Sequence, residues 1–330
     1  MCVAKSRKVS LKFASVKPTI LKIYTSIKSF HAEKQTIATI GTFDGVHIGH
    51  KKIIEKLTQN ATNLDCESLI LTFFPHPRMI LKGNSDVLLL NTLDEKKELL
   101  EWVGLDHLII HPFDAEFSQL EAADFVKSVL VDQFNIKKII IGHDHRFGKN
   151  RSANIDDLIL YGEKYGFEVE QIPVQEINAV SVSSTKIRNA ILDGDMTLAN
   201  NYLGYGYFLT GTVVKGKQLG RTIGFPTANI KINEDYKLIP KIGVYAVTST
   251  IDNELVFGMM NIGTNPTVGG QHLSIEVNFF DLDIDLYDKT LRISILQRIR
   301  DEHKFESVQI LKEQLGMDKL SAIAYFKRKY

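Results

Sequence analysis

Gly41-Thr-Phe-Asp-Gly-Val-His-Ile-Gly-His50 is the stretch that decides how the first half of this chain folds. It follows an apolar run at residues 35–40, which is typical of a buried strand, and it leads into residues 50–60, where apolar side chains recur at helical spacing. Strand-like and helical runs continue to alternate to about residue 175. This alternation predicts a parallel sheet that is covered by helices on both faces.

The pattern changes from Tyr207 onward. Short β-rich runs, separated by turns that contain Gly or Asn, occupy residues 208–214, 243–250, 255–261, 274–280 and 290–296. A helical tail is expected over about residues 307–329. We therefore predict an α/β domain with a Rossmann-like parallel sheet, followed by a small antiparallel β-barrel with a C-terminal helix.

The composition is that of an ordinary globular protein. A length of 330 residues suggests two domains at about 150 residues each. The net charge of +1 provides no general field for nucleic acid or an anionic membrane, so an anionic ligand needs a local site. The longest apolar run, residues 322–326, is too short to span a bilayer. Cys2 and Cys66 form no CxxC pair, so we expect a reducing, cytoplasmic setting without a zinc site.

We predict four segments along the chain: a basic leader at 1–16, an α/β domain at 17–192, a linker at 193–203 and a barrel domain at 204–330. The first thirty residues contain seven basic residues and no acidic one. That composition resembles an organellar transit peptide, but a plain basic leader or an upstream start codon is the simpler interpretation. The segment has no apolar h-region, so a secretory signal is not expected.

The opening motif has the character of a phosphate site. A junction of strand and helix gathers free backbone N–H groups and the positive end of the helix dipole. Gly45 and Gly49 allow the backbone to approach a ligand closely, and His47 and His50 can point toward one anion. Two imidazoles with backbone donors suit the charge that develops on a nucleotide α-phosphate when a substrate phosphate attacks it directly. The alternative is a pair of surface histidines at a helix cap.

A second segment, Val182-Ser-Ser-Thr-Lys-Ile-Arg188, strengthens this hypothesis. The hydroxyl groups of Ser183, Ser184 and Thr185 can cap a helix and bind phosphate, and Arg188 adds a bidentate cation. Taken alone, the segment is explained as well by an ordinary helix cap. The two motifs in one domain are more specific than either of them.

Two further loops, residues 73–78 and 142–148, also follow predicted strands. They are therefore expected at the carboxyl edge of the sheet, where ligands bind in open α/β folds. His143 and His145 lie in the second loop, but no third ligand has a suitable spacing. We expect hydrogen bonding or loop packing there rather than a metal site.

In the second half, Gly216-Lys-Gln-Leu-Gly-Arg-Thr-Ile-Gly-Phe-Pro-Thr-Ala-Asn229 suggests a phosphate-cradling loop before a strand. It is not a Walker A sequence. On an extended segment Thr227 and Asn229 face the same side, and a hydroxyl with an amide oxygen suits Mg²⁺ and phosphate. The alternative, a Gly-rich turn with a buried Thr, is favoured by composition alone.

Glu276 lies in a run that is otherwise apolar, after the turn-rich residues 258–267. A carboxylate on a half-buried strand needs a reason, because burial of an unpaired charge is costly. It could be paired structurally, or it could be a general base. The spacing leaves both interpretations open.

From about Lys17 onward, these motifs resemble those of the bifunctional bacterial riboflavin kinase/FMN adenylyltransferases, also called FAD synthetases. The resemblance implies that the first domain is a Rossmann-like nucleotidylyltransferase module in which His47, His50 and Arg188 act on the ATP phosphates. It also implies that the loop at 144–147 contributes to nucleotide or flavin binding. The positions it implies for binding are Gly41, Phe43, Asp44, Gly49, Asp144, Ser183, Ser184 and Thr185.

The second half matches the riboflavin kinase module of this family in its GRxxGFPTAN stretch, its GVYA strand at 243–246, its NIGxNPT turn and its glutamate strand. The resemblance implies Thr227 and Asn229 at the site of Mg²⁺ and ATP, and Glu276 as the base toward the ribityl 5′-hydroxyl. Other implied binding positions are Gly220, Arg221, Gly224 and Pro226. The chain departs from the family pattern at Asn278, where His is usual, and at Asp288 and Ala153, where Gly is usual.

The function expected from this resemblance has two steps. Riboflavin and Mg²⁺-ATP give FMN and ADP, and FMN and a second ATP then give FAD and pyrophosphate. We expect riboflavin, FMN and ATP as ligands, and no nucleic acid, membrane or obligate protein partner. One alternative is a nucleotidylyltransferase of single activity with a noncatalytic flavin-binding barrel. Another is a noncatalytic regulator that binds flavin or nucleic acid.

Overall fold

The computed structural model describes residues 20–330 apart from 82–86, 143–144, 173–181, 217 and 268–269. The expected basic leader at 1–16 lies outside the described residues. Contacts group the chain into two compact units, which we describe separately. Unit 1 comprises Met1–Gly41, Ile53–Phe74 and Lys97–Ile172, and unit 2 comprises Thr42–Lys52, Pro75–Lys96 and Pro173–Tyr330. The boundaries predicted at 192 and 203 stay a prediction.

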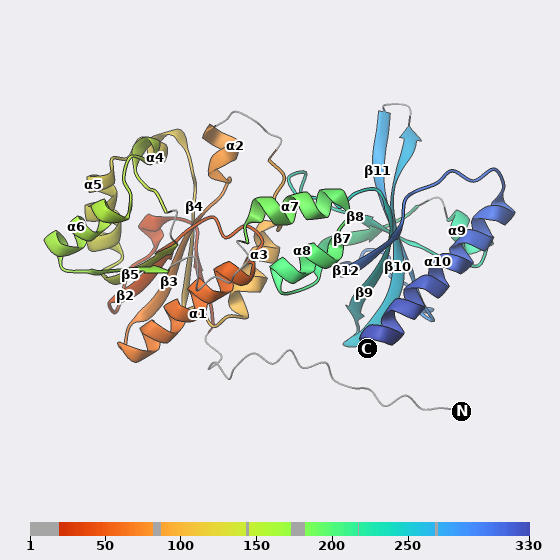
Figure 1. Ribbon diagram of the computed structural model, residues 1–330, viewed down its shortest axis with the longest axis horizontal. Coiled ribbons are helices and arrows are strands. Elements are labelled where there is room, and N and C mark those ends of the chain that lie inside the picture. Colours follow the sequence, from red (N-terminus) through yellow and green to blue (C-terminus); the bar gives the residue numbers. More distant parts are fainter. Residues whose placement is uncertain (1–19, 82–86, 143–144, 173–181, 217, 268–269) are drawn as a thin grey trace. The chain divides into compact units, whose positions relative to one another are not determined.

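Unit 1 is built on a parallel sheet of six strands in the order β1-β4-β3-β2-β5-β6 (Figure 1). The strands are β1 (Lys22–Tyr24), β2 (Thr36–Ile40), β3 (Glu67–Phe73), β4 (His107–His111), β5 (Ile136–Gly142) and β6 (Glu168–Ile172). The runs at β2 and β3 are almost wholly buried, and β5 is buried or half-buried throughout, as expected for strands with both faces covered. The predicted parallel sheet is confirmed.

The helices of unit 1 end where the sequence provides turn chemistry. They are η1 (Ile27–Ser29), most of α1 (Ile48–Asn63), the end of α3 (Leu93–Glu101), α4 (Ala115–Ser118), α5 (Ala122–Asp124), η2 (Phe125–Gln133), η3 (Lys149–Arg151) and α6 (Ile155–Tyr165). Asn154 caps α6 at its N-terminus, and Gly166 ends it in the left-handed conformation. The helix expected over 122–133 is α-helical only in its first turn and continues as the π-helix η2.

Unit 2 contains a closed antiparallel barrel in the order β10-β11-β8-β7-β12-β9 (Figure 1). Its strands are β7 (Tyr207–Val214), β8 (Ala228–Lys231), β9 (Gly243–Ile251), β10 (Glu254–Thr267), β11 (Gly270–Phe279) and β12 (Thr290–Arg300). The five predicted runs correspond to five of these strands. The strand β8 is not among the five runs, because it has four residues and follows a segment rich in Gly and Pro, after which the sequence indicated a strand without its bounds.

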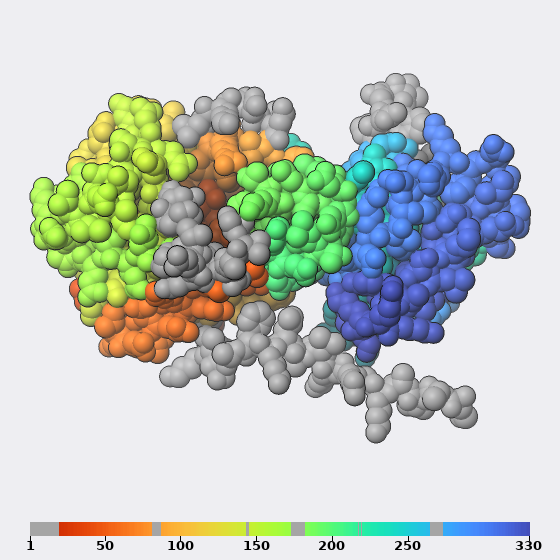
Figure 2. All heavy atoms as spheres, viewed as in Figure 1, coloured from red at the N-terminus to blue at the C-terminus, as the bar shows by residue number. Residues whose placement is uncertain are grey.

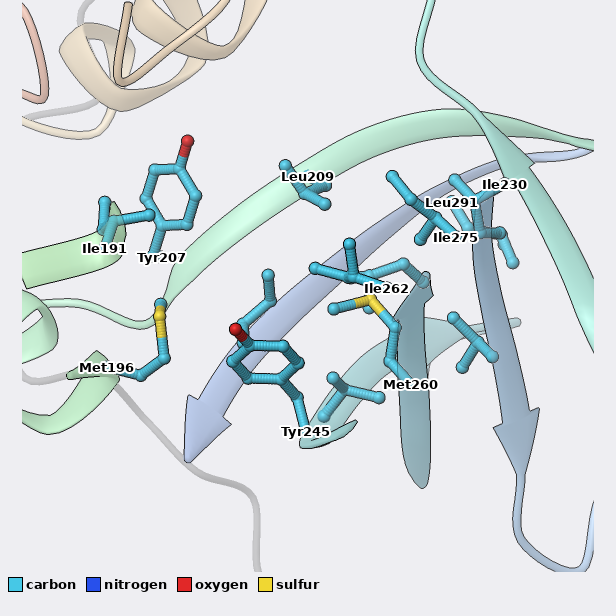
Figure 3. Packing of buried hydrophobic residues seen from close by; sticks show 14 of the residues in the cluster. Ile191, Met196, Tyr207, Leu209, Ile230, Tyr245, Met260, Ile262, Ile275 and Leu291 are labelled. Atoms are coloured by element: carbon cyan, nitrogen blue, oxygen red, sulfur yellow. The ribbon is translucent and has the colours of Figure 1, made fainter. Parts of the chain in front are cut away.

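The helices of unit 2 are α2 (Pro77–Leu81), α7 (Ser184–Asp193), α8 (Met196–Leu203), α9 (Leu219–Thr222) and α10 (Val308–Lys329). Residues 196–203, expected in a linker, form α8, and its Leu203 is fully buried. Together with Ile191 and Met196, the interior barrel residues Tyr207, Tyr245 and Met260 form one core (Figure 3). This shared core would tie α7 and α8 to the barrel with roughly 1.5–3 kcal/mol for each large apolar side chain.

The helix α10 covers part of the barrel's outer face. Its Ala322 and Phe326 pack with Ala246, Met259 and Leu296 of three strands. This contact explains why β9 is buried at nearly every position rather than at alternate ones. Apart from the buried Asp318, most of the other residues of α10 lie at the surface of unit 2, as the blue region of Figure 2 shows. The predicted C-terminal helix is confirmed.

Candidate active sites

The first motif begins where β2 ends. The neighbours of β2 are β3 and β5, so the strand order reverses at β2. In open parallel sheets, ligands bind outside the carboxyl ends of the strands at such a switch point. The helix α1 begins at Ile48, two residues earlier than the sequence predicts, so that Gly49 and His50 lie in its first turn.

The turn before α1 has an unusual backbone. Phe43, Gly45 and Val46 have positive φ angles of 47°, 86° and 36°. The φ angle of Gly45 favours glycine, and a Cβ atom there would lie 2.6 Å from Cδ1 of Leu90, so the end of that side chain would have to shift. Strained turns of this kind persist only when the surrounding structure holds them, and they cluster at functional sites.

The two histidines of the motif stack on one another. Their ring centroids are 3.6 Å apart with an angle of 15° between the planes, and Nδ1 of His47 accepts a bond from the backbone N–H of His50 at 3.3 Å. Burial lowers the pKa of His47 to about 4 and holds the pKa of His50 well below its usual range. Among the described residues, none forms a hydrogen bond with the buried Nδ1 of His50. Both imidazoles are therefore neutral at pH 7 and can each present one donor.

The buried Asp44 forms several of the contacts that hold this turn. Its Oδ1 accepts the backbone N–H of Leu90 at 2.8 Å, and its Oδ2 pairs with Nη2 of Arg188 at 2.8 Å. The backbone carbonyl of Asp44 accepts the hydroxyl of Ser184 at 2.9 Å. Burial raises the pKa of Asp44, while Lys96 and Arg188 act in the opposite direction. We interpret Asp44 as a residue that holds the turn together rather than one that reaches a ligand.

The Ser-Ser-Thr segment forms the N-terminus of α7, as predicted. Ser183 is the N-cap, and its side chain accepts the N–H of Lys186. Ser184 is tied to Asp44, whereas Thr185 is exposed. The structure thus brings Ser184 and Arg188 together with the histidine motif. Nε of Arg188 also donates to the carbonyl of Leu88 at 2.9 Å, so much of its guanidinium is held by the protein.

The sequence interpretation missed the segment at residues 88–96. Nζ of Lys96 donates to the carbonyl of Thr42 at 2.7 Å, and burial lowers the pKa of this lysine to about 8. Thr92 and Glu95 form reciprocal bonds at the start of α3, at 3.0 and 3.2 Å. The Thr-x-x-Glu spacing of such a capping box was a visible signal for the helix start. Nothing in the spacing indicates which residues the segment contacts.

The remaining predicted positions of this site are Gly41, Phe43, Asp144 and the two loops that follow strands. Gly41 donates its N–H to the carbonyl of Leu71 at the end of the sheet. The ring of Phe43 is buried and lies 5.0 Å from the ring of His50. His143 and Asp144 lie outside the described residues. In the other loop, burial lowers the pKa of His76 to about 4.

The second candidate site lies on the outer face of the barrel. In β11, Glu276 lies opposite Asn229 of β8 on one side and opposite Asn261 of β10 on the other. Residues directly opposite each other on paired strands share a face. The neighbouring Ile275 and Val277 belong to the barrel core. Glu276 therefore faces outward with an amide on each flank, and Asn261 is a neighbour that sequence reasoning did not single out.

Thr227 joins this row just before β8 begins. Its hydroxyl donates to Oε2 of Glu276 at 3.1 Å. A hydroxyl and an amide oxygen are hard oxygen ligands, so Thr227 and Asn229 fit Mg²⁺ bound together with phosphate oxygens, beside the carboxylate of Glu276. Among the described residues, no group of three His, Cys, Asp or Glu side chains could hold a metal ion by itself.

The glycines of the loop at 216–224 allow it to fold closely against this row. A Cβ atom on Gly216 would lie 2.1 Å from Nδ2 of Asn229, and one on Gly220 would lie 2.2 Å from the carbonyl oxygen of Phe225. Gly224 has a φ of 87°. Arg221, in the short helix α9 within this loop, is exposed.

The three departures from the family pattern have different consequences. Nδ2 of Asn278 donates to the carbonyl of Pro226 at 2.7 Å, so this residue holds the segment that carries Thr227. Asp288 has a φ of 63°, a conformation that Asp tolerates better than most residues but that glycine adopts freely. Ala153 is buried and pairs with Phe147, and its φ is not positive. Only Asp288 therefore replaces glycine where a left-handed conformation is needed.

Comparison with known proteins divides the chain into two consecutive parts. A family model described as FAD synthetase matches residues 29–186, and one described as riboflavin kinase matches residues 203–326. No helix in the described part of the chain is long and apolar enough to cross a membrane.

Three relatives and one solved structure illustrate the similarity. Bifunctional riboflavin kinase/FMN adenylyltransferases from Listeria monocytogenes, Escherichia coli K12 and Bacillus subtilis are 39%, 34% and 35% identical to this chain. The matches cover 88%, 88% and 89% of this chain and 93%, 92% and 93% of those relatives. A crystal structure described as a macrolide-efflux protein from Streptococcus pneumoniae has a TM-score of 0.84 and 32% identity. That match covers 92% of this chain and 98% of the other.

Proposed function

This chain belongs to the family of bifunctional riboflavin kinase/FMN adenylyltransferases, and on that premise we propose which of its residues carry out the two reactions. The enzyme phosphorylates riboflavin with ATP to give FMN. It then transfers the adenylyl group of a second ATP to FMN, which gives FAD and pyrophosphate. Nothing in the comparisons favours a single activity.

For the kinase reaction, we assign Glu276 as the general base. The carboxylate would accept the proton of the ribityl 5′-hydroxyl as that oxygen attacks the γ-phosphate of ATP. Thr227 and Asn229 would hold Mg²⁺ together with the nucleotide phosphates. The bound cation would neutralise charge on those phosphates. The observation that carries this assignment is the hydrogen bond of Thr227 to Glu276, with Asn229 opposite the same residue.

For the adenylyl transfer, we assign His47 and His50 as neutral hydrogen-bond donors to the ATP phosphates. In this step an FMN phosphate oxygen attacks the α-phosphorus and pyrophosphate leaves, so no protein nucleophile is required. The free N–H groups at the start of α1 would add to the stabilisation of the developing charge. Arg188, fixed by Asp44 and Leu88, would direct its charge toward the same phosphates. The start of α7 would complete the triphosphate site.

The remaining expectations follow from the two reactions. The ligands would be riboflavin, FMN, ATP and Mg²⁺, and the place of action would be the cytoplasm. We propose no nucleic acid or obligate protein partner, in keeping with the net charge of +1.

The experiment that tests the assignment is a time course with riboflavin, ATP and Mg²⁺ in which flavins are separated by chromatography. FMN should appear first and FAD later. His50→Ala should abolish FAD formation from supplied FMN and leave FMN formation intact. Loss of FMN formation in the same variant would overturn the division of labour between the two sites.

A further inference from the structure

A buried ion pair in unit 2 is used by neither of the reactions proposed above. Nζ of Lys237 lies 2.5 Å from Oε2 of Glu95, and their side chains are 0% and 2% exposed. The two residues are 142 positions apart in the chain. Buried ion pairs stabilise a fold poorly, because the loss of hydration offsets much of their attraction. The pair therefore needs an explanation other than stability.

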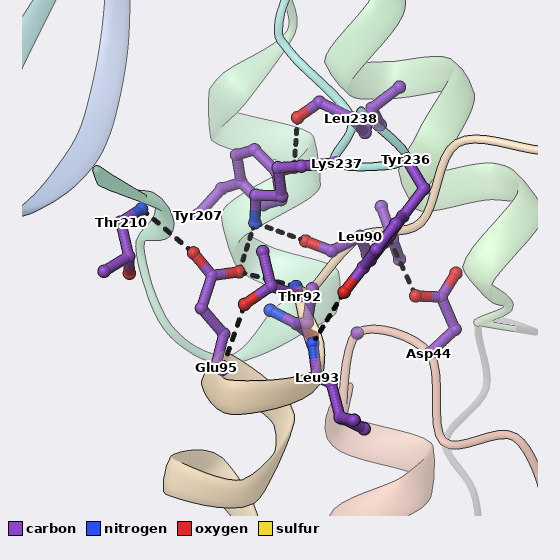
Figure 4. A network of polar contacts seen from close by, with 12 residues as sticks. Asp44, Leu90, Thr92, Leu93, Glu95, Tyr207, Thr210, Tyr236, Lys237 and Leu238 are labelled. Atoms are coloured by element: carbon purple, nitrogen blue, oxygen red, sulfur yellow. Dashed lines mark hydrogen bonds and ion pairs between the residues drawn. The ribbon is translucent and has the colours of Figure 1, made fainter. Parts of the chain in front are cut away.

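The pair is the centre of a wider contact between the segment at 88–95 and the barrel half (Figure 4). Nζ of Lys237 also donates to the carbonyl of Leu90 at 2.7 Å, and Oε1 of Glu95 accepts the N–H of Thr210 at 3.0 Å. Leu89 forms a parallel bridge with Lys237, with backbone bonds of 2.7 Å to Tyr236 and 2.8 Å from Leu238. The segment is thus held by backbone and side-chain contacts together.

The same segment also contacts Asp44 and Arg188 of the proposed adenylyl site. The N–H of Leu90 donates to Oδ1 of Asp44, and the carbonyl of Leu88 accepts Nε of Arg188. Leu90 is therefore held on both sides, by Lys237 through its carbonyl and by Asp44 through its N–H. A Cβ atom on Gly45 would touch the side chain of Leu90, so the turn lies directly against this residue.

We infer that Lys237 is a positioning residue for FMN adenylylation, although it lies within residues 203–326, which match the riboflavin kinase family model. By fixing Leu90, it holds Asp44, and with Asp44 the side chain of Arg188 and the turn that carries His47. The inference rests on the function proposed above for these residues. Misplacement of a catalytic group by about 1 Å can cost on the order of 100-fold in rate.

The test compares both activities of the full-length enzyme in Lys237→Met, which keeps the length of the side chain and removes its charge. We expect kcat for FAD formation from FMN to fall on the order of 10- to 100-fold. FMN formation from riboflavin should stay at the level of the matched control Lys241→Met, in which an exposed lysine is replaced. An unchanged rate of FAD formation would overturn the inference, and so would an equal fall in both activities.

A second variant separates positioning from stability. Lys237→Met leaves Glu95 as a buried unpaired charge, and Glu95→Gln combined with Lys237→Met removes that charge. The double variant should recover the melting temperature and remain slow in FAD formation, because the carbonyl of Leu90 still lacks its lysine. Recovery of FAD formation together with the melting temperature would show that the pair is structural only.

The wild type distinguishes failure of this inference from failure of the proposed function. If the wild type and Lys241→Met make FAD and His50→Ala does not, the assignment of the adenylyl site stands whatever Lys237→Met does. If the wild type itself makes no FAD from FMN, the proposed function fails first, and the inference about Lys237 fails with it.

Discussion

Oγ1 of Thr227 lies 3.1 Å from Oε2 of Glu276, although the two residues are 49 positions apart in the chain. The bond fixes one carboxylate oxygen of Glu276 and thereby orients the second oxygen as well. Across the strands, Asn229 lies opposite the same glutamate. A residue that could serve as base is therefore placed by the residues that could hold the metal and nucleotide.

Glu276→Gln should slow FMN formation on the order of 10²–10⁴-fold, because the amide cannot accept the proton of the ribityl hydroxyl. FAD formation from supplied FMN should be retained. Chromatography of the flavins measures both activities in one preparation. Glu254→Gln, on an exposed part of β10, is the matched control and should behave as the wild type. FMN formation at the wild-type rate in Glu276→Gln would remove this residue as the base.

Thr227→Ala should weaken the kinase site by about 1 kcal/mol, roughly fivefold in kcat/KM for Mg²⁺-ATP, because both the bond to Glu276 and one oxygen ligand are lost. Thr227→Ser keeps the hydroxyl and should retain most of the activity. Steady-state kinetics at varied Mg²⁺-ATP measures the difference. Equal effects of the two variants would show that the methyl group rather than the hydroxyl matters.

Gly45→Ala should impair FAD formation and destabilise the protein more than Gly166→Ala. Both glycines have similar positive φ angles, 86° and 81°, so each alanine costs roughly 1–2 kcal/mol of backbone strain. The new Cβ meets Leu90 at 2.6 Å in the first case and nothing within 4 Å in the second. Denaturant unfolding of the two variants isolates the effect of the contact with Leu90. Equal losses of stability would contradict this interpretation of Gly45.

The folded protein should lose stability as the pH falls from about 6.5 to about 4. Burial lowers the pKa of His47 to about 4 from its ordinary value of 6.5, so in this range the unfolded chain binds a proton that the folded chain does not. The contribution of His47 to the free energy of unfolding should fall by at most about 1.4 kcal/mol per pH unit. The full contribution of His47 is present above pH 6.5, where its imidazole is neutral in both the folded and the unfolded chain.

Denaturant unfolding at a series of pH values measures this slope. His47→Gln has no imidazole at this position, so its slope between pH 6.5 and 4 should be shallower than that of the wild type. Parallel slopes in the two proteins would show that His47 is not held in its neutral form.

The sequence predicted those parts of the fold that a short segment marks by its own pattern of apolar residues and turns. The motif at 41–50 marks a strand end and a helix start, and the alternating runs after Tyr207 mark a barrel. The π-helix η2 was not foreseen, because its residues have ordinary helical periodicity. The bounds of the strand β8 were not predicted, since four residues are too few to show alternation.

The sequence indicated which residues of the candidate sites lie close together. It did not indicate which contacts join them. The neighbours of the motif at 41–50 include Ser184 and Arg188, as expected. That Asp44 binds Arg188 through a buried contact, or that Lys96 lies under Thr42, depends on residues many positions apart. No local spacing encodes such contacts. The roles of the individual residues in the two reactions stay predictions.

The contact of Lys237 with Leu90 and Glu95 bears on how this enzyme can be rebuilt. A chimera that joined residues 1–200 of this chain to the barrel half of a relative would combine a carbonyl and a carboxylate from one parent with a cation from the other. Such a graft should work best when the donor supplies a lysine at the position of Lys237 together with the neighbouring backbone of Tyr236 and Leu238. The two halves of the chain therefore cannot be exchanged independently, and residues 88–95 should be exchanged along with the barrel.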